Sequence, residues 1–262
     1  MILLTDLAQV PDLSAPVILT IGNFDGLHRG HKRVLRKVIT RAREEGGTSC
    51  VVTFEPHPLK VLHPEQAPQL IQTRAEKRSI LVHLGLEVLV EVAFSRAFAQ
   101  VEAEAFARLL AASLRPLEIY IGEDFHFGRG RKGGIELLQS LQGELGFLAT
   151  AFPKLKVAGE EVSSTRIRKL LLSGKMDEAN HLLGRPYVIE GMVEHGDGRG
   201  KTLGFPTANL AIENELVPAH GVYAVAVDVG EALLLPGVAN LGTRPTFDGS
   251  LVAVEVHCLS GG

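Results

Sequence analysis

Residues 22–31, with the sequence GNFDGLHRGH, combine the residue types that bind phosphate. They follow a short apolar run and precede an amphipathic stretch, so glycines let the backbone approach a ligand and a helix start directs free N–H groups at an anion. His28 and His31 stand three residues apart, and at a helix start both imidazoles can face one phosphate. Donors of this kind stabilise charge that develops on phosphoryl oxygens during transfer. The glycine spacing differs from G-x-G-x-x-G, which argues against a hydride-transfer enzyme.

A second phosphate-binding pattern lies at residues 163–168, SSTRIR. Hydroxyl groups at a helix N-terminus cap the helix and can also bind phosphate oxygens, and Arg168, one turn on, supplies a forked cationic donor. Standing alone, this segment could be a helix cap followed by a solvated arginine. Its pairing with residues 22–31 favours a phosphate site.

The elements that must position these residues alternate between strand and helix in the first part of the chain. We expect strands over 17–22, 49–54, 86–94, 117–122 and 147–152, and helices over 31–46, 73–84, 102–112 and 134–142. This alternation predicts a first domain over residues 1–162, built on a doubly wound parallel sheet whose strand ends form a ligand crevice. Residues 163–185 predict two short helices that link the domains and complete the first. Residues 186–262 predict a small antiparallel barrel.

Composition excludes several classes of protein. The chain of 262 residues has 27 basic and 30 acidic residues, a balance that argues against a nucleic-acid surface. Its apolar runs are too short to span a bilayer, and without a secretory signal we expect a cytoplasmic protein. Cys50 and Cys258 are far apart, so we expect free thiols and neither a disulfide framework nor a thiolate zinc site.

The two phosphate-binding segments resemble the two signatures of the nucleotidyltransferase superfamily. Its members join a nucleoside triphosphate to a phosphate- or carboxylate-bearing acceptor and release pyrophosphate. The resemblance implies catalytic roles for His28, His31 and Arg168. It implies nucleotide binding by Gly22, Asn23, Phe24, Asp25, Gly30, Ser163, Ser164 and Thr165.

Two further segments, TFEPHP at 53–58 and GEDFHFG at 122–128, look like motifs of the adenylyltransferase domain of bacterial bifunctional riboflavin kinase/FAD synthetases. Phenylalanine rings offer flat apolar faces on which a flavin can stack. A single phenylalanine is more often a core residue, but these are grouped at the ends of expected strands. The resemblance implies flavin binding by Phe54, Pro56, His57, Pro58, Asp124, Phe125 and Phe127.

The last part of the chain resembles the riboflavin kinase barrel at 191–210, 218–224 and 240–247. HGDGRGKT is not a P-loop, because His195 stands where glycine is required. The resemblance implies that Thr207 and Asn209, on one face of an extended segment, hold Mg²⁺ through oxygen ligands. Alternation places Glu255 on the strand face opposite an apolar one, and the resemblance implies that it is the general base for the riboflavin hydroxyl. The implied nucleotide-binding residues are Gly196, Gly198, Arg199, Lys201 and Gly204.

The resemblance as a whole implies an enzyme that phosphorylates riboflavin to FMN and adenylylates FMN to FAD, with ATP as the second substrate of both steps. It implies small-molecule substrates, with neither a nucleic acid nor a membrane as partner, and leaves the oligomeric state open. Family members continue beyond the position of Gly262 with a strand and a helix, so we expect an incomplete barrel and poor kinase activity. Two alternatives remain: a monofunctional FMN adenylyltransferase with an inactive kinase module, and a non-catalytic flavin- or nucleotide-binding regulator.

Overall fold

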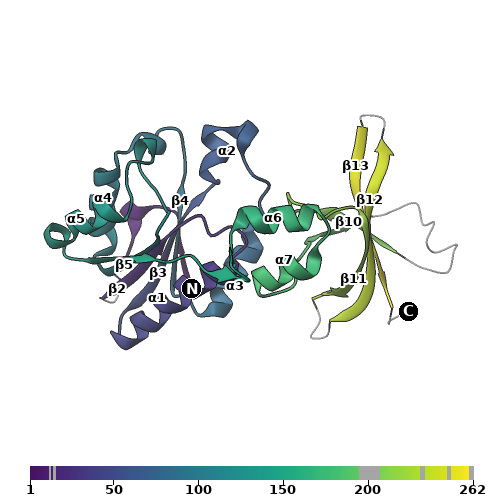
Figure 1. The fold of residues 1–262 in the computed structure, drawn as a ribbon, viewed down its shortest axis with the longest axis horizontal. Helices are drawn as coiled ribbons and strands as arrows, with labels where there is room; N and C mark the ends of the chain where they lie inside the picture. Colours follow the sequence, from purple (N-terminus) through teal and green to yellow (C-terminus); the bar gives the residue numbers. More distant parts are fainter. Residues whose placement is uncertain (12, 14–15, 195–206, 231–233, 247–248, 260–262) are drawn as a thin grey trace. The chain divides into compact units, whose positions relative to one another are not determined.

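The computed structural model describes the chain except for residues 12, 14–15, 195–206, 231–233, 247–248 and 260–262 (Figure 1). The described chain divides into two compact units. The first comprises Met1–Gln69 and Arg74–Ser164, and the second comprises Leu70–Thr73 and Thr165–Gly262.

The first unit is built on a six-stranded sheet in which every neighbouring pair of strands is parallel. The order is β1-β4-β3-β2-β5-β6, which confirms the predicted doubly wound fold. The order reverses between β2 and β5, and ligands of such sheets bind beyond the strand ends at this point. The strands are β1 (Ile2–Leu4), β2 (Val17–Ile21), β3 (Thr48–Glu55), β4 (Val88–Ala93), β5 (Pro116–Gly122) and β6 (Leu148–Phe152).

Helices cover both faces of this sheet. One core combines α1 and α3 with one side of β2, β3 and β4, and a second core combines α4 and α5 with the other side. Successive residues of β2 show the division, since Ile18 belongs to the first core and Leu19 to the second. The helices are α1 (Arg29–Glu44), α2 (Pro58–Leu62), α3 (Arg74–Leu84), α4 (Ala103–Leu114) and α5 (Ile135–Leu145).

Several short elements lie outside the predicted pattern. β1 pairs with β4 over three residues, and α2 starts at Pro58 after an N-cap at His57, whose Nδ1 accepts the Leu59 N–H at 3.2 Å. A proline is tolerated in a first helical turn because its missing N–H has no partner there. The others are the hairpin β7 (Lys156–Val157) and β8 (Glu160–Glu161), and 3-10 turns at Leu7–Gln9, Pro64–Gln66, Phe98–Gln100 and Arg129–Arg131.

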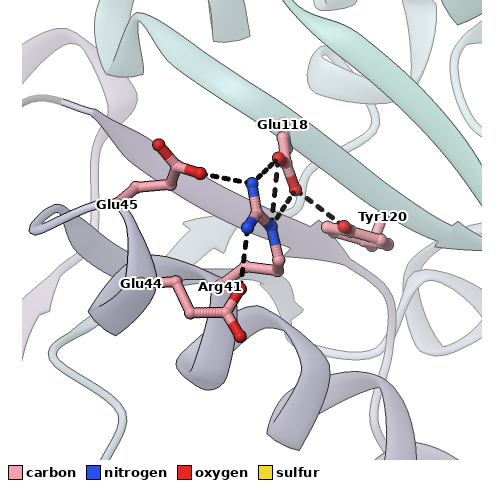
Figure 2. Close-up of polar contacts among 5 residues, drawn as sticks. All are labelled: Arg41, Glu44, Glu45, Glu118 and Tyr120. Atoms are coloured by element: carbon pink, nitrogen blue, oxygen red, sulfur yellow. Dashed lines mark hydrogen bonds and ion pairs between the residues drawn. The ribbon is translucent and has the colours of Figure 1, made fainter.

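An ion-pair cluster joins the last turns of α1 to the start of β5 (Figure 2). The guanidinium of Arg41 donates to Glu118 at 2.6 Å, to Glu44 at 2.7 Å and to Glu45 at 2.5 Å. The Tyr120 hydroxyl donates to Glu118 at 2.7 Å. Arg41 holds the pKa of Glu118 below its usual range, whereas burial and the neighbouring carboxylate raise the pKa of Tyr120 to about 12. The cluster fixes α1 at the end far from its first turn.

The second unit has two helices, α6 (Ser164–Leu172) and α7 (Met176–Leu183), and a five-stranded antiparallel sheet ordered β11-β12-β13-β10-β9. One face of the sheet is apolar, with Ala239, Leu241, Val254 and Val256 buried in a core. The predicted helix pair and antiparallel strands are thus confirmed. The strands are β9 (Gly191–Glu194), β10 (Ala208–Ile212), β11 (Gly221–Val227), β12 (Leu235–Thr246) and β13 (Gly249–Cys258).

Both cysteines are free, as predicted. Burial raises the pKa of the Cys50 thiol to about 12, while Cys258 is half-buried at the end of β13. Within the described ranges, no helix combines the length and the apolar character needed to cross a membrane.

Candidate active sites

The loop that follows β2 turns sharply before α1 begins. Phe24 has φ of 49° and Leu27 has φ of 40°, both in the left-handed region that non-glycine residues rarely adopt, and Gly26 between them has φ of 80°. Each such residue other than glycine costs about 1–3 kcal/mol and persists only where the surroundings fix it. Strain of this kind gathers at functional sites, and here it lies at the switch point of the sheet.

His28 and His31 meet at the start of α1, as the sequence predicts. His28 is the N-cap, and its Nδ1 accepts the backbone N–H of His31 at 3.2 Å. The two rings stack with centroids 3.6 Å apart and planes 16° from parallel. A side chain at position 30 would crowd the His28 ring, because a Cβ at this position would lie 3.1 Å from it. The spacing H-x-G-H therefore allows the imidazoles of His28 and His31 to stack at the start of α1.

The His31 side chain is electrically neutral near pH 7. Burial lowers its pKa well below the usual value, and the neighbouring His28 and Lys77 lower it further. Its Nδ1 is buried and has no hydrogen-bond partner among the residues that the structure describes. The Phe24 ring meets it edge-on, with centroids 5.2 Å apart. A neutral imidazole with an unused nitrogen is suited to binding a ligand at this position.

The second phosphate-binding segment reaches the loop through one hydroxyl. Ser164 donates to the backbone carbonyl of Asp25 at 2.9 Å. Ser163 is half-buried beside it, whereas Thr165 is exposed and Arg168 is half-buried on α6, both within the second unit. The structure therefore brings the two segments together at Ser164 and Asp25.

The aromatic residues predicted to bind flavin occupy two kinds of place. Phe54 and Phe127 are only 7% and 5% exposed and belong to the core between the sheet and α4. Phe106 packs against both rings, with centroids 6.2 Å and 5.5 Å away. Phe125 is half-buried and stacks on Phe127. Of the three rings, Phe125 leaves most surface for a flavin.

The other residues of these two segments that are predicted to bind flavin are less buried than Phe54 and Phe127. His57 is half-buried, and its Nε2 lies 3.4 Å from the side-chain nitrogen of Asn23, so this segment meets the loop after β2. Pro56 is exposed and Pro58 half-buried on either side of it. Asp124 is exposed and forms an ion pair with Lys154 at 3.1 Å.

In the second unit, strand register aligns the predicted base with a predicted metal ligand. Asn209 of β10 lies directly opposite Glu255 of β13, and residues in this relation have Cβ atoms about 4.5–5.5 Å apart. Glu255 is half-buried, while Val254 and Val256 on either side of it are buried on the other face. The predicted alternation of this strand is thus confirmed.

The same register places two more polar residues beside the pair Asn209 and Glu255. Glu194 of β9 lies opposite Asn209, and Asn240 of β12 lies opposite Glu255. Sequence reasoning missed both residues, because pairing between strands distant in the chain cannot be deduced from spacing. Thr207, just before β10, is exposed. The predicted nucleotide-binding residues Gly196, Gly198, Arg199, Lys201 and Gly204 lie outside the described residues.

Comparison with protein families assigns both parts of the chain. Residues 11–166 match the FAD synthetase family and residues 183–261 match the riboflavin kinase family. A bifunctional riboflavin kinase/FMN adenylyltransferase of Escherichia coli is 41% identical over 256 residues, which cover 97% of this chain and 81% of that protein. The chain belongs to this bifunctional family. Another member, from Bacillus subtilis, is 39% identical over 91% of this chain and 75% of its own.

A solved structure has a fold similar to that of this chain. The crystal structure of a protein from Streptococcus pneumoniae, named as a macrolide-efflux protein, superimposes with a TM-score of 0.88. It is 32% identical in sequence and matches all of this chain and 85% of its own.

Proposed function

We propose that the family's two activities are divided between the two units. The first unit adenylylates FMN to FAD, and the second phosphorylates riboflavin to FMN. The observation that carries the first assignment is the stacked pair His28 and His31, which lies at a helix start beyond the switch point of a parallel sheet. Phosphate groups bind at this kind of position because free N–H groups and the helix dipole favour anions.

In the adenylyl-transfer step, an FMN phosphate oxygen attacks the α-phosphorus of ATP. A phosphorus–oxygen bond forms to FMN, and the bond to the bridging oxygen of the leaving pyrophosphate breaks. The attacking phosphate is ionised near neutral pH, so the step needs no general base. His28, His31 and Ser164 position the triphosphate and offset the developing charge, and Phe125 and His57 contact the flavin.

In the kinase step, the attacking group is a hydroxyl and must lose its proton. The riboflavin hydroxyl attacks the γ-phosphorus of ATP, ADP leaves with the electrons of the broken bond, and Glu255 accepts the proton. The half-buried position of Glu255 on the polar face of β13 supports this role. A carboxylate is therefore needed in the second unit and not in the first.

Mg²⁺ belongs to this proposal as the ion that accompanies ATP. The oxygen donors of Thr207 and Asn209 suit a hard cation, and Asn209 lies on the strand position opposite Glu255. Bound there, the ion would neutralise charge on the phosphates of ATP.

The test is an incubation of the purified chain with ATP, Mg²⁺ and either riboflavin or FMN, followed by chromatography of the flavins. We expect FAD from both substrates, formed more slowly from riboflavin than from FMN. FAD from FMN alone would identify a monofunctional adenylyltransferase with an inactive kinase module. Flavin binding without consumption of ATP would identify a regulator and overturn the proposal.

A further inference from the structure

Lys77 is a buried lysine that no motif of the sequence singles out. It lies in α3, is 9% exposed, and its Nζ donates to the backbone carbonyl of Asn23 at 3.1 Å. The hydroxyl of Thr53, in β3, donates to the same carbonyl at 3.3 Å, and Thr53 is 1% exposed. Lysine is almost never buried unless it has a partner. Two buried donors from two elements thus converge on one backbone oxygen.

The position of that oxygen gives the contact its importance. Asn23 immediately precedes Phe24, whose φ of 49° starts the strained turn toward His28. A carbonyl oxygen has two lone pairs, so Lys77 and Thr53 together use its full capacity as an acceptor. A strained turn persists only where the surroundings hold it, and these two hydrogen bonds hold its first residue.

The charge of Lys77 also acts on this loop. Burial lowers its pKa, while the carboxylates of Asp25, Glu55 and Glu91 raise it and Arg74 opposes them. Three carboxylates therefore favour the ammonium form in a place where burial disfavours it. The same ammonium contributes to the lowered pKa of His31, after burial and the ring of His28.

We propose that Lys77 is a positioning residue for adenylyl transfer: with Thr53, it holds the Asn23 carbonyl so that the loop presents His28 and His31 to the triphosphate. The inference rests on the proposed function of the first unit. Lys77 acts through the loop and the imidazoles, and its own ammonium does not contact the reacting atoms.

Three variants separate this role from a general contribution to packing. Lys77→Met removes donor and charge, Lys77→Arg keeps both with a different shape, and Thr53→Val removes only the neutral donor. We expect Lys77→Met to lower kcat for FAD formation from FMN about 10²-fold, since small misplacements of catalytic groups have effects of this size. Thr53→Val should lower kcat less, and Lys77→Arg should recover part of the loss. The KM for ATP should change less than kcat in all three.

A control for folding is present in the same chain. Phosphorylation of riboflavin should stay within a factor of about two in every variant, because Lys77 and Thr53 lie outside the second unit. A loss of both activities together in Lys77→Met would indicate impaired folding. The test of the proposal then rests on Thr53→Val and Lys77→Arg. Thr53→Val with an unchanged kcat for FAD formation would then overturn the proposal.

A titration provides a readout that does not depend on turnover. NMR of the protein with isotope-labelled histidine, without ATP, follows the protonation of the His31 imidazole. The rings of Phe24 and His28 contact this imidazole, and the charge of Lys77 lowers its pKa. Lys77→Met should raise the pKa of His31, whereas Thr53→Val and Lys77→Arg should leave it unchanged. An unchanged titration together with an unchanged kcat in Lys77→Met would refute the inference. A wild-type protein that makes no FAD would instead refute the proposed function.

Discussion

The two units place the residues of their proposed sites in different ways. The first unit has a strained loop and a helix start beyond the end of β2, where the imidazoles of His28 and His31 stack at the first turn of α1. The second unit uses side chains in the middle of strands, where the register of β9, β10, β13 and β12 aligns Glu194, Asn209, Glu255 and Asn240.

In the proposed function, this difference corresponds to the two acceptors, the FMN phosphate and the riboflavin hydroxyl. A phosphate acceptor is already an anion, so its site needs donors that bind and orient charge. A hydroxyl acceptor must lose a proton, so its site needs a base. Under the proposed function, the chemistry of the acceptor, more than the shared use of ATP, therefore explains which residue types each unit supplies.

Removal of the proposed base, Glu255, should produce the largest difference between the two activities. Glu255→Gln should lower the rate of FMN formation from riboflavin by about 10²- to 10⁴-fold, since it removes the proton acceptor and keeps the shape. FAD formation from FMN should be unchanged. Flavin chromatography over time measures both rates. Glu213→Gln, at an exposed position of the same unit, is the matched control. A normal kinase rate in Glu255→Gln would contradict the role of Glu255 as the base and, with it, the contrast between the two units.

The reciprocal change lies in the first unit. His28→Ala removes the cap of α1 and one ring of the stack, so FAD formation from FMN should fall about 10²- to 10³-fold. The kinase rate should stay at its wild-type value. His83→Ala changes an exposed histidine of α3 and should alter neither rate. Equal losses of both activities in His28→Ala would show that the units are not independent.

A smaller change sharpens the description of the loop. Gly30→Ala places a Cβ 3.1 Å from the His28 ring, which must shift by a few tenths of an ångström. We expect FAD formation to fall about tenfold, less than for a misplacement of 1 Å. Gly143→Ala, where no atom lies within 4 Å of the added Cβ, should leave steady-state rates unchanged. Similar rates in the two variants would contradict the packing of Gly30 against His28.

The smallest effect concerns stability and pH. Because the folded protein holds the pKa of His31 below its unfolded value of about 6.5, the unfolded chain binds more protons as the pH falls below this value. The free energy of unfolding of the first unit should therefore decrease between pH 6.5 and the lower folded pKa, by up to about 1.4 kcal/mol for each pH unit that separates the folded from the unfolded pKa. Urea unfolding of wild type and His31→Gln at several pH values measures it. Identical pH dependence in the two proteins would contradict a buried neutral His31.

The sequence predicted those features that depend on local pattern. The apolar positions Val34, Leu35, Val38, Ile39 and Ala42 predict the buried face of α1, and all five are buried. The pairing of His28 with His31 follows from a spacing of three residues at a helix start.

Features that depend on tertiary contact could not be predicted in the same way. Lys77 reaches Asn23 across 54 positions of the chain, and no spacing records that contact. A phenylalanine at a strand end can face either the core or a ligand, and only packing shows that Phe54 and Phe127 face the core. The polar neighbours of Glu255 depend on strand register, which distant pairings determine.

The most direct test of two separate sites on one chain is complementation between variants. His28→Ala and Glu255→Gln are each incubated with riboflavin, ATP and Mg²⁺, first alone and then mixed, and FAD is measured by chromatography. We predict little FAD from either variant alone and restored FAD from the mixture, because one supplies FMN and the other converts it. A mixture that makes no more FAD than the separate variants would contradict the account.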